Sequence, residues 1–150
     1  MLYIYEFEVF QSEGYLVAIP FDFDGATQGR NEKEVAEMAA DWLKLEIEYR
    51  LIDNQKIPEA SFGNEPQKGG RSMIVAVEAS LDTINAVQAY QAADMLKVSR
   101  GRVSQMLSVG LLKGFRKGRD AFITLDSINA RLNEMPKVGR PRQKTELQSK

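Results

Sequence analysis

Apolar and polar residues alternate with the period of a β-strand near the start of the chain. Residues 2–10 follow this alternation, and residues 14–19 predict a second strand after a turn at residues 11–14. A bend at residues 22–25 then precedes a short third strand over residues 26–29. These patterns predict a hairpin with a third strand after it.

The period changes to that of a helix after residue 30. Asn31 and Glu34 have the spacing of a helix-capping pair, and apolar residues then recur at helical intervals for about five turns. We interpret Met38 and Trp42 within this stripe as core residues. The stripe comprises Val35, Ala36, Met38, Ala39, Trp42, Leu43, Leu45, Ile47 and Leu51. A loop over residues 57–71 leads to an apolar strand over residues 73–77, which we expect to rejoin the sheet.

A second helical pattern spans residues 91–107 and predicts two short helices joined by a tight turn. Ser99 precedes the second helix and is placed to cap it. Apolar residues at matching positions would pack the helices together; they are Ala92, Ala93, Leu96, Val98, Val103, Met106 and Leu107. The spacing is typical of a helix-turn-helix.

The outward side of the second predicted helix is polar and basic. Arg and Gln carry forked donors and acceptors that match guanine and adenine edges in the major groove. The candidate DNA-contacting residues on this side are Arg100, Arg102, Ser104 and Gln105, with Ser108 beside them. Double-stranded operator DNA is therefore the leading candidate partner.

Residues 111–125 predict a hairpin that turns around residues 118–120, with a closing helix over residues 126–132. Its tip is basic through Arg116, Lys117 and Arg119, which are placed to contact phosphates. We expect Phe115, Phe122 and Ile123 to pack inward.

Charge is divided unevenly along the chain, although the net charge is only −1. Residues 1–80 contain 7 Lys and Arg against 15 Asp and Glu, whereas residues 81–150 contain 13 against 6. A basic domain favours phosphate, and an acidic one favours a basic protein surface. The two halves are therefore expected to have different partners.

The chain contains no cysteine and no histidine, which excludes disulfides, thiolate catalysis, Ser-His catalysis and the usual Cys/His metal sites. We expect no secretion, because residues 1–6 lack a basic stretch, and the sequence contains no apolar run of about 18 residues. We expect a cytoplasmic protein that does not enter membranes, is not an enzyme and needs no cofactor.

Residues 87–132 resemble the excisionase and MerR-type winged helix-turn-helix, at Ala92-Ala93, Leu96, Val98-Ser99, Val103, Leu107, Gly110-Leu111, Phe115-Arg116, Gly118 and Ile123. The resemblance implies that the helix around Arg100 enters the major groove and that residues 116–119 contact the adjacent backbone.

Residues 1–80 resemble the HicB antitoxin domain, at Glu13-Gly14-Tyr15-Leu16-Val17, Phe21-Asp22-Phe23-Asp24-Gly25, Thr27-Gln28-Gly29, Glu34 and Ala36. The resemblance implies a degenerate ribonuclease-H-like topology without catalytic activity. It also implies a small, basic HicA-like ribonuclease toxin as partner and repression of the protein's own operon.

Two further patterns have alternative interpretations. Glu6, Glu8, Asp22 and Asp24 are carboxylates that a two-metal ribonuclease could use, but the glutamates fit a solvated strand face and the aspartates an ordinary turn equally well. Gly139-Arg140-Pro141-Arg142 matches the core of an AT-hook, in which Arg140 and Arg142 would enter a narrow minor groove; the alternative is a basic tail that binds phosphate without sequence preference.

We expect an α+β protein with a β-β-β-α-β HicB-like domain over residues 1–80, a mostly α winged helix-turn-helix domain over residues 84–133, and a basic flexible tail over residues 134–150. The expected function is that of an antitoxin and autorepressor; the alternative is a transcriptional regulator without a toxin partner. One helix-turn-helix offers a small contact area, so a homodimer or higher homo-oligomer is expected, with the amino-terminal sheet as its candidate contact surface.

Overall fold

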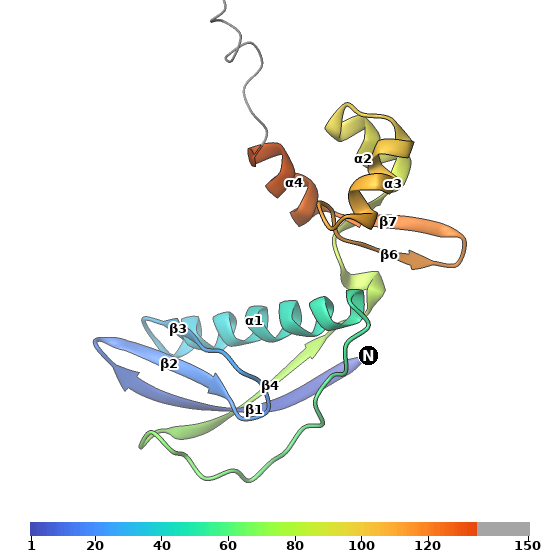
Figure 1. Cartoon of the computed structure of the whole chain (residues 1–150). Helices are drawn as coiled ribbons and strands as arrows, with labels where there is room; N and C mark the ends of the chain where they lie inside the picture. The colour runs from blue at the N-terminus through green and yellow to red at the C-terminus, as the bar shows by residue number, and fades with distance from the viewer. Residues whose placement is uncertain (135–150) are drawn as a thin grey trace, which may run out of the picture. The chain divides into compact units, whose positions relative to one another are not determined.

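The computed structural model describes residues 1–134, which form a mixed α+β protein (Figure 1). The chain divides into two compact units, one spanning Met1–Ile84 and the other beginning at Asn85. The division follows a short 3₁₀ helix, η1 (Leu81–Thr83), which the Ser80 side chain caps. Within residues 1–134, no helix has the length and apolar character needed to cross a membrane.

The first unit is built on a four-stranded antiparallel sheet in the order β3-β2-β1-β4. Its strands are β1 (Leu2–Ser12), β2 (Tyr15–Pro20), β3 (Thr27–Gly29) and β4 (Arg71–Glu78). The turn between β1 and β2 contains Glu13 and Gly14, which both have positive φ angles, of 52° and 84°. This backbone suits a tight hairpin. The predicted strands and their order are confirmed.

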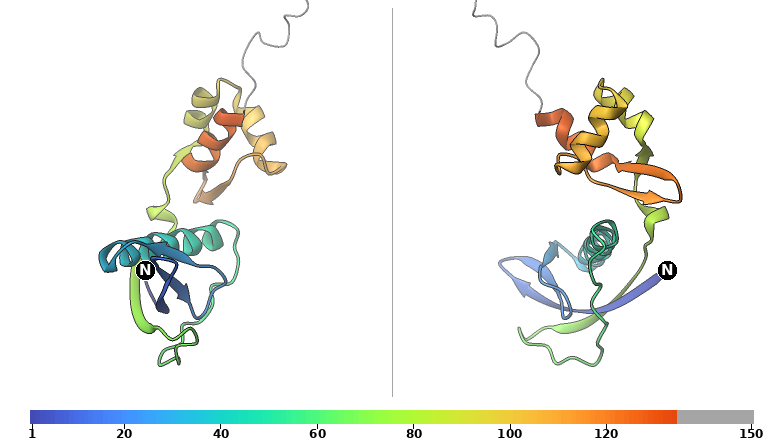
Figure 2. Two further views of the ribbon diagram at one scale, coloured as in Figure 1. Left: turned by 90° about the vertical axis from the view of Figure 1, so that its left-hand side faces the viewer. Right: turned by 45° about the vertical axis from the view of Figure 1, so that its right-hand side comes forward.

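Helix α1 (Glu32–Ile52) lies across one face of this sheet, as Figures 1 and 2 show. The Asn31 side chain accepts a hydrogen bond from the backbone N–H of Glu34 at 2.9 Å, as the capping pattern predicted. The Glu34 carboxylate accepts from the backbone N–H of Arg30 at 2.6 Å. The reciprocal bond of a capping box therefore goes to the residue before the cap.

The buried stripe of α1 is narrower than the sequence predicted. Val35, Ala39, Leu43 and Ile47 recur every four residues and are fully buried against the sheet. The prediction that Met38 is a core residue is wrong, because its side chain is 41% exposed. Two further stripe members are also exposed, namely Ala36 and Leu45. A helix packed on one face of a sheet buries about one side of its surface, so residues around the flank stay in solvent.

Trp42 lies at the edge of this buried stripe and packs against the core. Its ring meets Phe23 edge-on at 5.9 Å and Phe7 at 6.2 Å between centroids. Gly25 lies so close to this ring that a Cβ atom would be 2.5 Å from Trp42 Cζ2. The bend before β3 therefore needs glycine at this position, where φ is also +137°.

The second unit contains β5 (Ala86–Gln88), α2 (Ala89–Leu96), α3 (Arg100–Ser108), β6 (Gly114–Lys117), β7 (Asp120–Thr124) and α4 (Leu125–Glu134). Its strands form an antiparallel sheet in the order β5-β7-β6. Strand β5 was not predicted. It has only three residues, and its pairing of Val87 with Ile123 depends on a segment more than thirty positions away.

The core of the second unit joins α2, α3, α4 and the sheet. Its buried residues are Ala92, Ala93, Leu96, Val103, Met106, Leu112, Ile123 and Ile128. Val98 and Leu107 are partly buried and pack against this core. The predicted packing positions of the two helices are therefore confirmed.

The predicted inward packing of the hairpin is correct for Ile123 and wrong for Phe115 and Phe122. Phe115 pairs directly with Phe122 across β6 and β7, so both side chains project from the same face of the sheet. Ile123 projects from the other face, where it is fully buried. The two phenylalanine rings stack on each other at 5.6 Å and remain half-buried outside the core.

Candidate nucleic-acid interface

The turn between α2 and α3 is fixed by local hydrogen bonds. Lys97 ends α2 in the left-handed backbone region, with φ 59° and ψ 46°. The backbone N–H of Val98 donates to the carbonyl of Ala93 at 3.0 Å. The Ser99 hydroxyl accepts from the backbone N–H of Arg102 at 3.1 Å, so the predicted helix cap is confirmed. These bonds set the direction in which α3 leaves α2.

The four residues selected on α3 share its exposed side; they are Arg100, Arg102, Ser104 and Gln105. Arg102 Nη1 donates to Gln105 Oε1 at 2.6 Å, which holds these two side chains together. The neighbouring Ser108 hydroxyl instead donates to the backbone carbonyl of Gln105, at 2.9 Å. The exposed side of α3 therefore presents guanidinium and amide groups in adjacent positions.

Tyr90 of α2 also contributes to the exposed surface around α3, and the sequence interpretation did not include this residue. The guanidinium carbon of Arg100 lies 5.5 Å from the centroid of the Tyr90 ring, within cation–π range. Tyr90 is 45% exposed. A signal was present in the sequence, because Tyr90 falls outside the buried stripe of Ala92, Ala93 and Leu96. An aromatic residue off the buried stripe of a short helix is a candidate contact residue.

The three basic residues selected on the hairpin are all exposed at its tip. Arg116 and Lys117 end β6, and Arg119 follows Gly118 in a two-residue turn that connects Lys117 to its partner Asp120. The Lys117 ammonium lies 5.5 Å from the centroid of the Phe122 ring. The half-buried phenylalanine pair is therefore next to the basic tip.

The hairpin starts directly beside α3. A Cβ atom on Gly114 would lie 3.0 Å from Leu107 Cδ2 of α3 and 2.3 Å from the carbonyl oxygen of Phe122. Only glycine allows this close approach. The structure thus brings α3 and the hairpin together in one unit.

The segment that contains α3 and the start of the hairpin carries positive charges only. Residues 95–119 contain seven Lys and Arg residues and no Asp or Glu. Six of these seven belong to α3, to the turn before it, or to the hairpin tip. Arg140 and Arg142, the remaining selected residues, lie outside the described residues. The described basic residues create a positive region suited to polyanions.

Three of the four candidate acidic residues of the first unit, Glu6, Glu8 and Asp22, have structural roles. Glu6 is 5% exposed and accepts hydrogen bonds from the backbone N–H and the side-chain amide of Asn64, at 2.9 and 2.8 Å. The Asp22 carboxylate accepts from the backbone N–H and the hydroxyl of Ser61, at 2.9 and 2.7 Å. Both carboxylates therefore bind the loop that connects α1 to β4.

Glu8 holds the same loop further along. It is 3% exposed, and its two oxygens accept backbone N–H bonds from Gln67, Lys68 and Gly70 at 2.7–3.0 Å. The interpretation of Glu6 and Glu8 as a solvated strand face is wrong, because this loop covers them. A period-two pattern identifies the face of a strand but does not show what covers it.

These hydrogen bonds also shift the carboxyl pKa values. The backbone N–H of Asn64, followed by its side-chain amide, lowers the pKa of Glu6 below the ordinary value. Burial raises the pKa of Glu8, but the three backbone donors together outweigh it, so this pKa is also lowered. Within residues 1–134, no three carboxylates are grouped so that they could hold a metal ion.

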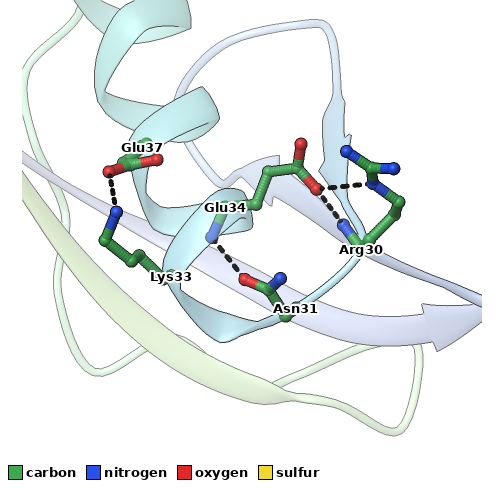
Figure 3. Close-up of a pocket in the computed structure, with 5 residues that line it drawn as sticks. All are labelled: Arg30, Asn31, Lys33, Glu34 and Glu37. Atoms are coloured by element: carbon green, nitrogen blue, oxygen red, sulfur yellow. Dashed lines mark hydrogen bonds and ion pairs between the residues drawn. The ribbon is translucent and has the colours of Figure 1, made fainter.

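A surface hollow at the start of α1 is lined by Arg30, Asn31, Lys33, Glu34 and Glu37 (Figure 3). Lys33 and Glu37 form an ion pair at 3.0 Å, and Arg30 Nε contacts the Glu34 carboxylate at 3.3 Å. The Arg30 backbone N–H lowers the pKa of Glu34. The charged groups of this hollow neutralise one another and support the start of the helix.

The second unit therefore contains the stronger candidate site. Its exposed guanidinium, ammonium, amide and hydroxyl groups can donate hydrogen bonds to phosphates and to base edges. Comparison of the chain with known protein families, with curated proteins and with solved structures found no match.

Proposed function

We propose that the second unit is a winged helix-turn-helix that binds double-stranded DNA. In this proposal α3 enters the major groove, and Arg116, Lys117 and Arg119 of the hairpin contact the adjacent phosphates. The observation that carries the proposal is the position of Arg102 and Gln105 side by side on the exposed side of a capped helix. Arg pairs with guanine and Gln with adenine through two hydrogen bonds each.

The first unit is the proposed antitoxin domain. Residues 1–84 contain 16 Asp and Glu against 7 Lys and Arg, which suits a small basic ribonuclease as partner. The strand, strand, strand, helix, strand order supports the HicB resemblance at the level of element order. In the proposed mechanism this unit blocks the toxin while the second unit holds the complex on its own operator. Residues Arg140 and Arg142 would add affinity for the minor groove or for phosphate.

The contacts of the acidic residues favour this role over the alternative of a metal-dependent ribonuclease. Glu6, Glu8 and Asp22 accept seven hydrogen bonds from the α1–β4 loop. We therefore assign these carboxylates to loop attachment and no residue to catalysis.

DNA binding is tested with duplexes that cover the region upstream of the protein's own gene. The expected result is a complex that forms on one such duplex and withstands competition by unrelated DNA. Equal binding to every duplex would contradict the assignment of α3 to base contacts. No binding at low salt, where phosphate contacts are strongest, would contradict DNA binding altogether.

The antitoxin role is tested by growth. Cells express the small reading frame beside this gene, with and without this protein supplied separately. If the protein relieves the toxicity of this frame, the result supports the antitoxin role. If residues 1–84 alone relieve the toxicity, the role belongs to the first unit. A neighbouring frame without toxicity, together with specific DNA binding, supports a regulator without a toxin partner.

A further inference from the structure

Strand β4 forms one outer edge of the first unit's sheet. It pairs with β1 over eight residues, from Arg71 opposite Val9 to Glu78 opposite Leu2. No other strand within residues 1–134 pairs with it. Its other edge therefore presents a row of backbone N–H and C=O groups available for pairing with a further strand.

This edge lacks the features that usually prevent strands from pairing between molecules. Proteins protect edges with short strands, prolines, bulges or charged side chains. The opposite edge is short, because β3 has only three residues. In β4, by contrast, residues 72–77 contain no proline, glycine or charged residue. Its two charged residues already have partners, since Arg71 contacts Glu32 and Glu78 contacts the Met1 ammonium group at 3.1 Å.

An apolar surface lies directly beside this edge. Ile74 is 55% exposed, and on β1 Leu2 and Ile4 are 53% and 37% exposed. Ile4 is opposite Ala76 in the register, so these even-numbered residues share the face of the sheet that α1 does not cover. The α1–β4 loop covers Glu6 and Glu8 on this face but leaves Ile74, Ile4 and Leu2 exposed. An uncharged strand edge thus continues into an apolar patch.

We propose that a second copy of this chain pairs with β4 in antiparallel orientation, around a two-fold axis near Ile74. Two identical strands can pair in this way, and the four-stranded sheets then join into one of eight strands. With Ile74 on the axis, Met73 lies opposite Val75 of the second copy, and both helices α1 stay on one face. Two-fold contacts of this kind use the same surface patch on both molecules.

The lack of charge on residues 72–77 fits a second copy better than a basic partner. The first unit is strongly acidic, so two such units repel each other least where the facing surfaces lack charge. The β4 edge and the apolar patch meet this condition. A basic protein would find only one carboxylate on residues 71–78, that of Glu78 at the end of the strand. The pairing would supply the two copies that the proposed DNA binding needs, but it does not depend on DNA or on a toxin.

The first test measures the mass of the full-length protein in solution across a range of concentrations. We expect a dimer for the wild-type chain. Ile74→Lys should dissociate it, because two lysines then face each other on the axis. Ala76→Lys should weaken it, because each copy then places a lysine opposite Ser72 of the other. The dimer dissociation constant should rise about tenfold or more. Phe62→Lys is the matched control, because Phe62 is also 55% exposed but lies in the α1–β4 loop. A monomeric wild-type chain, or a dimer unaffected by both β4 variants, would overturn the proposal.

A second test remains valid if a lysine variant folds poorly. Because the chain contains no cysteine, one introduced cysteine reports a single contact. Directly opposed Cα atoms in an antiparallel pair are about 4.5–5.5 Å apart, which is within the range of a disulfide. Ile74→Cys should therefore form an intermolecular disulfide under mild oxidation, while Phe62→Cys should not. Equal cross-linking of the two variants, or none in Ile74→Cys, would contradict the pairing, and neither result would bear on DNA binding.

Discussion

Arg102 Nη1 lies 2.6 Å from Oε1 of Gln105, three positions further along α3. The bond restricts two long side chains on an exposed helix surface before any ligand binds. Ordering such side chains in advance reduces the conformational entropy lost when a complex forms. The Arg102–Gln105 pair is therefore ordered before the proposed DNA contact forms.

Replacing both Arg102 and Gln105 with alanine should abolish discrimination between operator and unrelated DNA. Each base contacted through two hydrogen bonds contributes about 1–3 kcal/mol of discrimination. Competition binding with operator and scrambled duplexes measures the change. Asn129→Ala, an exposed polar change on α4, serves as the control. Unchanged operator preference in the double variant would refute the assigned contacts.

Arg116→Ala should weaken DNA binding by a similar factor for every sequence. A phosphate contact contributes through counterion release, so its loss should reduce the slope of log affinity against log salt by about 1. Titrations at several salt concentrations measure this slope. Lys33→Ala removes a positive charge that is paired with Glu37 in the first unit, and it should leave the slope unchanged.

Ser99→Ala should destabilise the second unit by about 1 kcal/mol, because the Ser99 hydroxyl satisfies a backbone N–H at the start of α3. Ser104→Ala is a change of the same chemistry at an exposed position inside the helix. It should alter stability by no more than about 0.5 kcal/mol. Chemical denaturation of the two variants gives the comparison, and equal effects would contradict the role of Ser99 as a cap.

Leu43→Ala should destabilise the first unit by about 2–5 kcal/mol, because Leu43 is fully buried and its loss leaves a cavity. Leu45→Ala, two positions away, should cost less than about 0.5 kcal/mol because that side chain is 49% exposed. Urea unfolding of the two variants tests the narrow stripe of α1. Similar losses from both would show that Leu45 also belongs to the core.

Glu8→Gln should lower the stability of the first unit at neutral pH, because an amide cannot accept all three backbone N–H bonds that the carboxylate accepts. The folded-state pKa of Glu8 is below its ordinary value, so the unfolded chain binds this proton more tightly. The stabilisation from Glu8 is therefore fully present above about pH 4.3 and is lost as pH falls through the folded-state pKa.

The difference in thermal unfolding midpoint between wild type and Glu8→Gln should accordingly shrink on acidification. Unfolding curves at a series of pH values between neutral and about pH 3 measure it. Glu13→Gln, in the exposed turn after β1, should follow the wild type throughout. A difference that stays constant with pH would show that the Glu8 carboxylate does not hold the loop in its charged form.

The sequence by itself determined the features that depend on neighbouring residues. The caps at Asn31 and Ser99 and the packing positions of α2 and α3 are set by hydrogen bonds and spacings within a few residues. The hairpin of β1 and β2 likewise follows from its alternation and from the glycine in its turn. Local patterns also located the exposed basic residues of α3 and of the β6–β7 tip.

Only the tertiary structure decided which faces of these elements are covered. Glu6 and Glu8 are buried because a loop some sixty positions away donates backbone hydrogen bonds to them. Met38 and Leu45 are exposed because the sheet contacts only one side of α1, and Phe115 and Phe122 lie outside the core because their strand register places them on one face. Burial depends on contacts between segments distant in sequence, and periodicity alone does not specify those contacts.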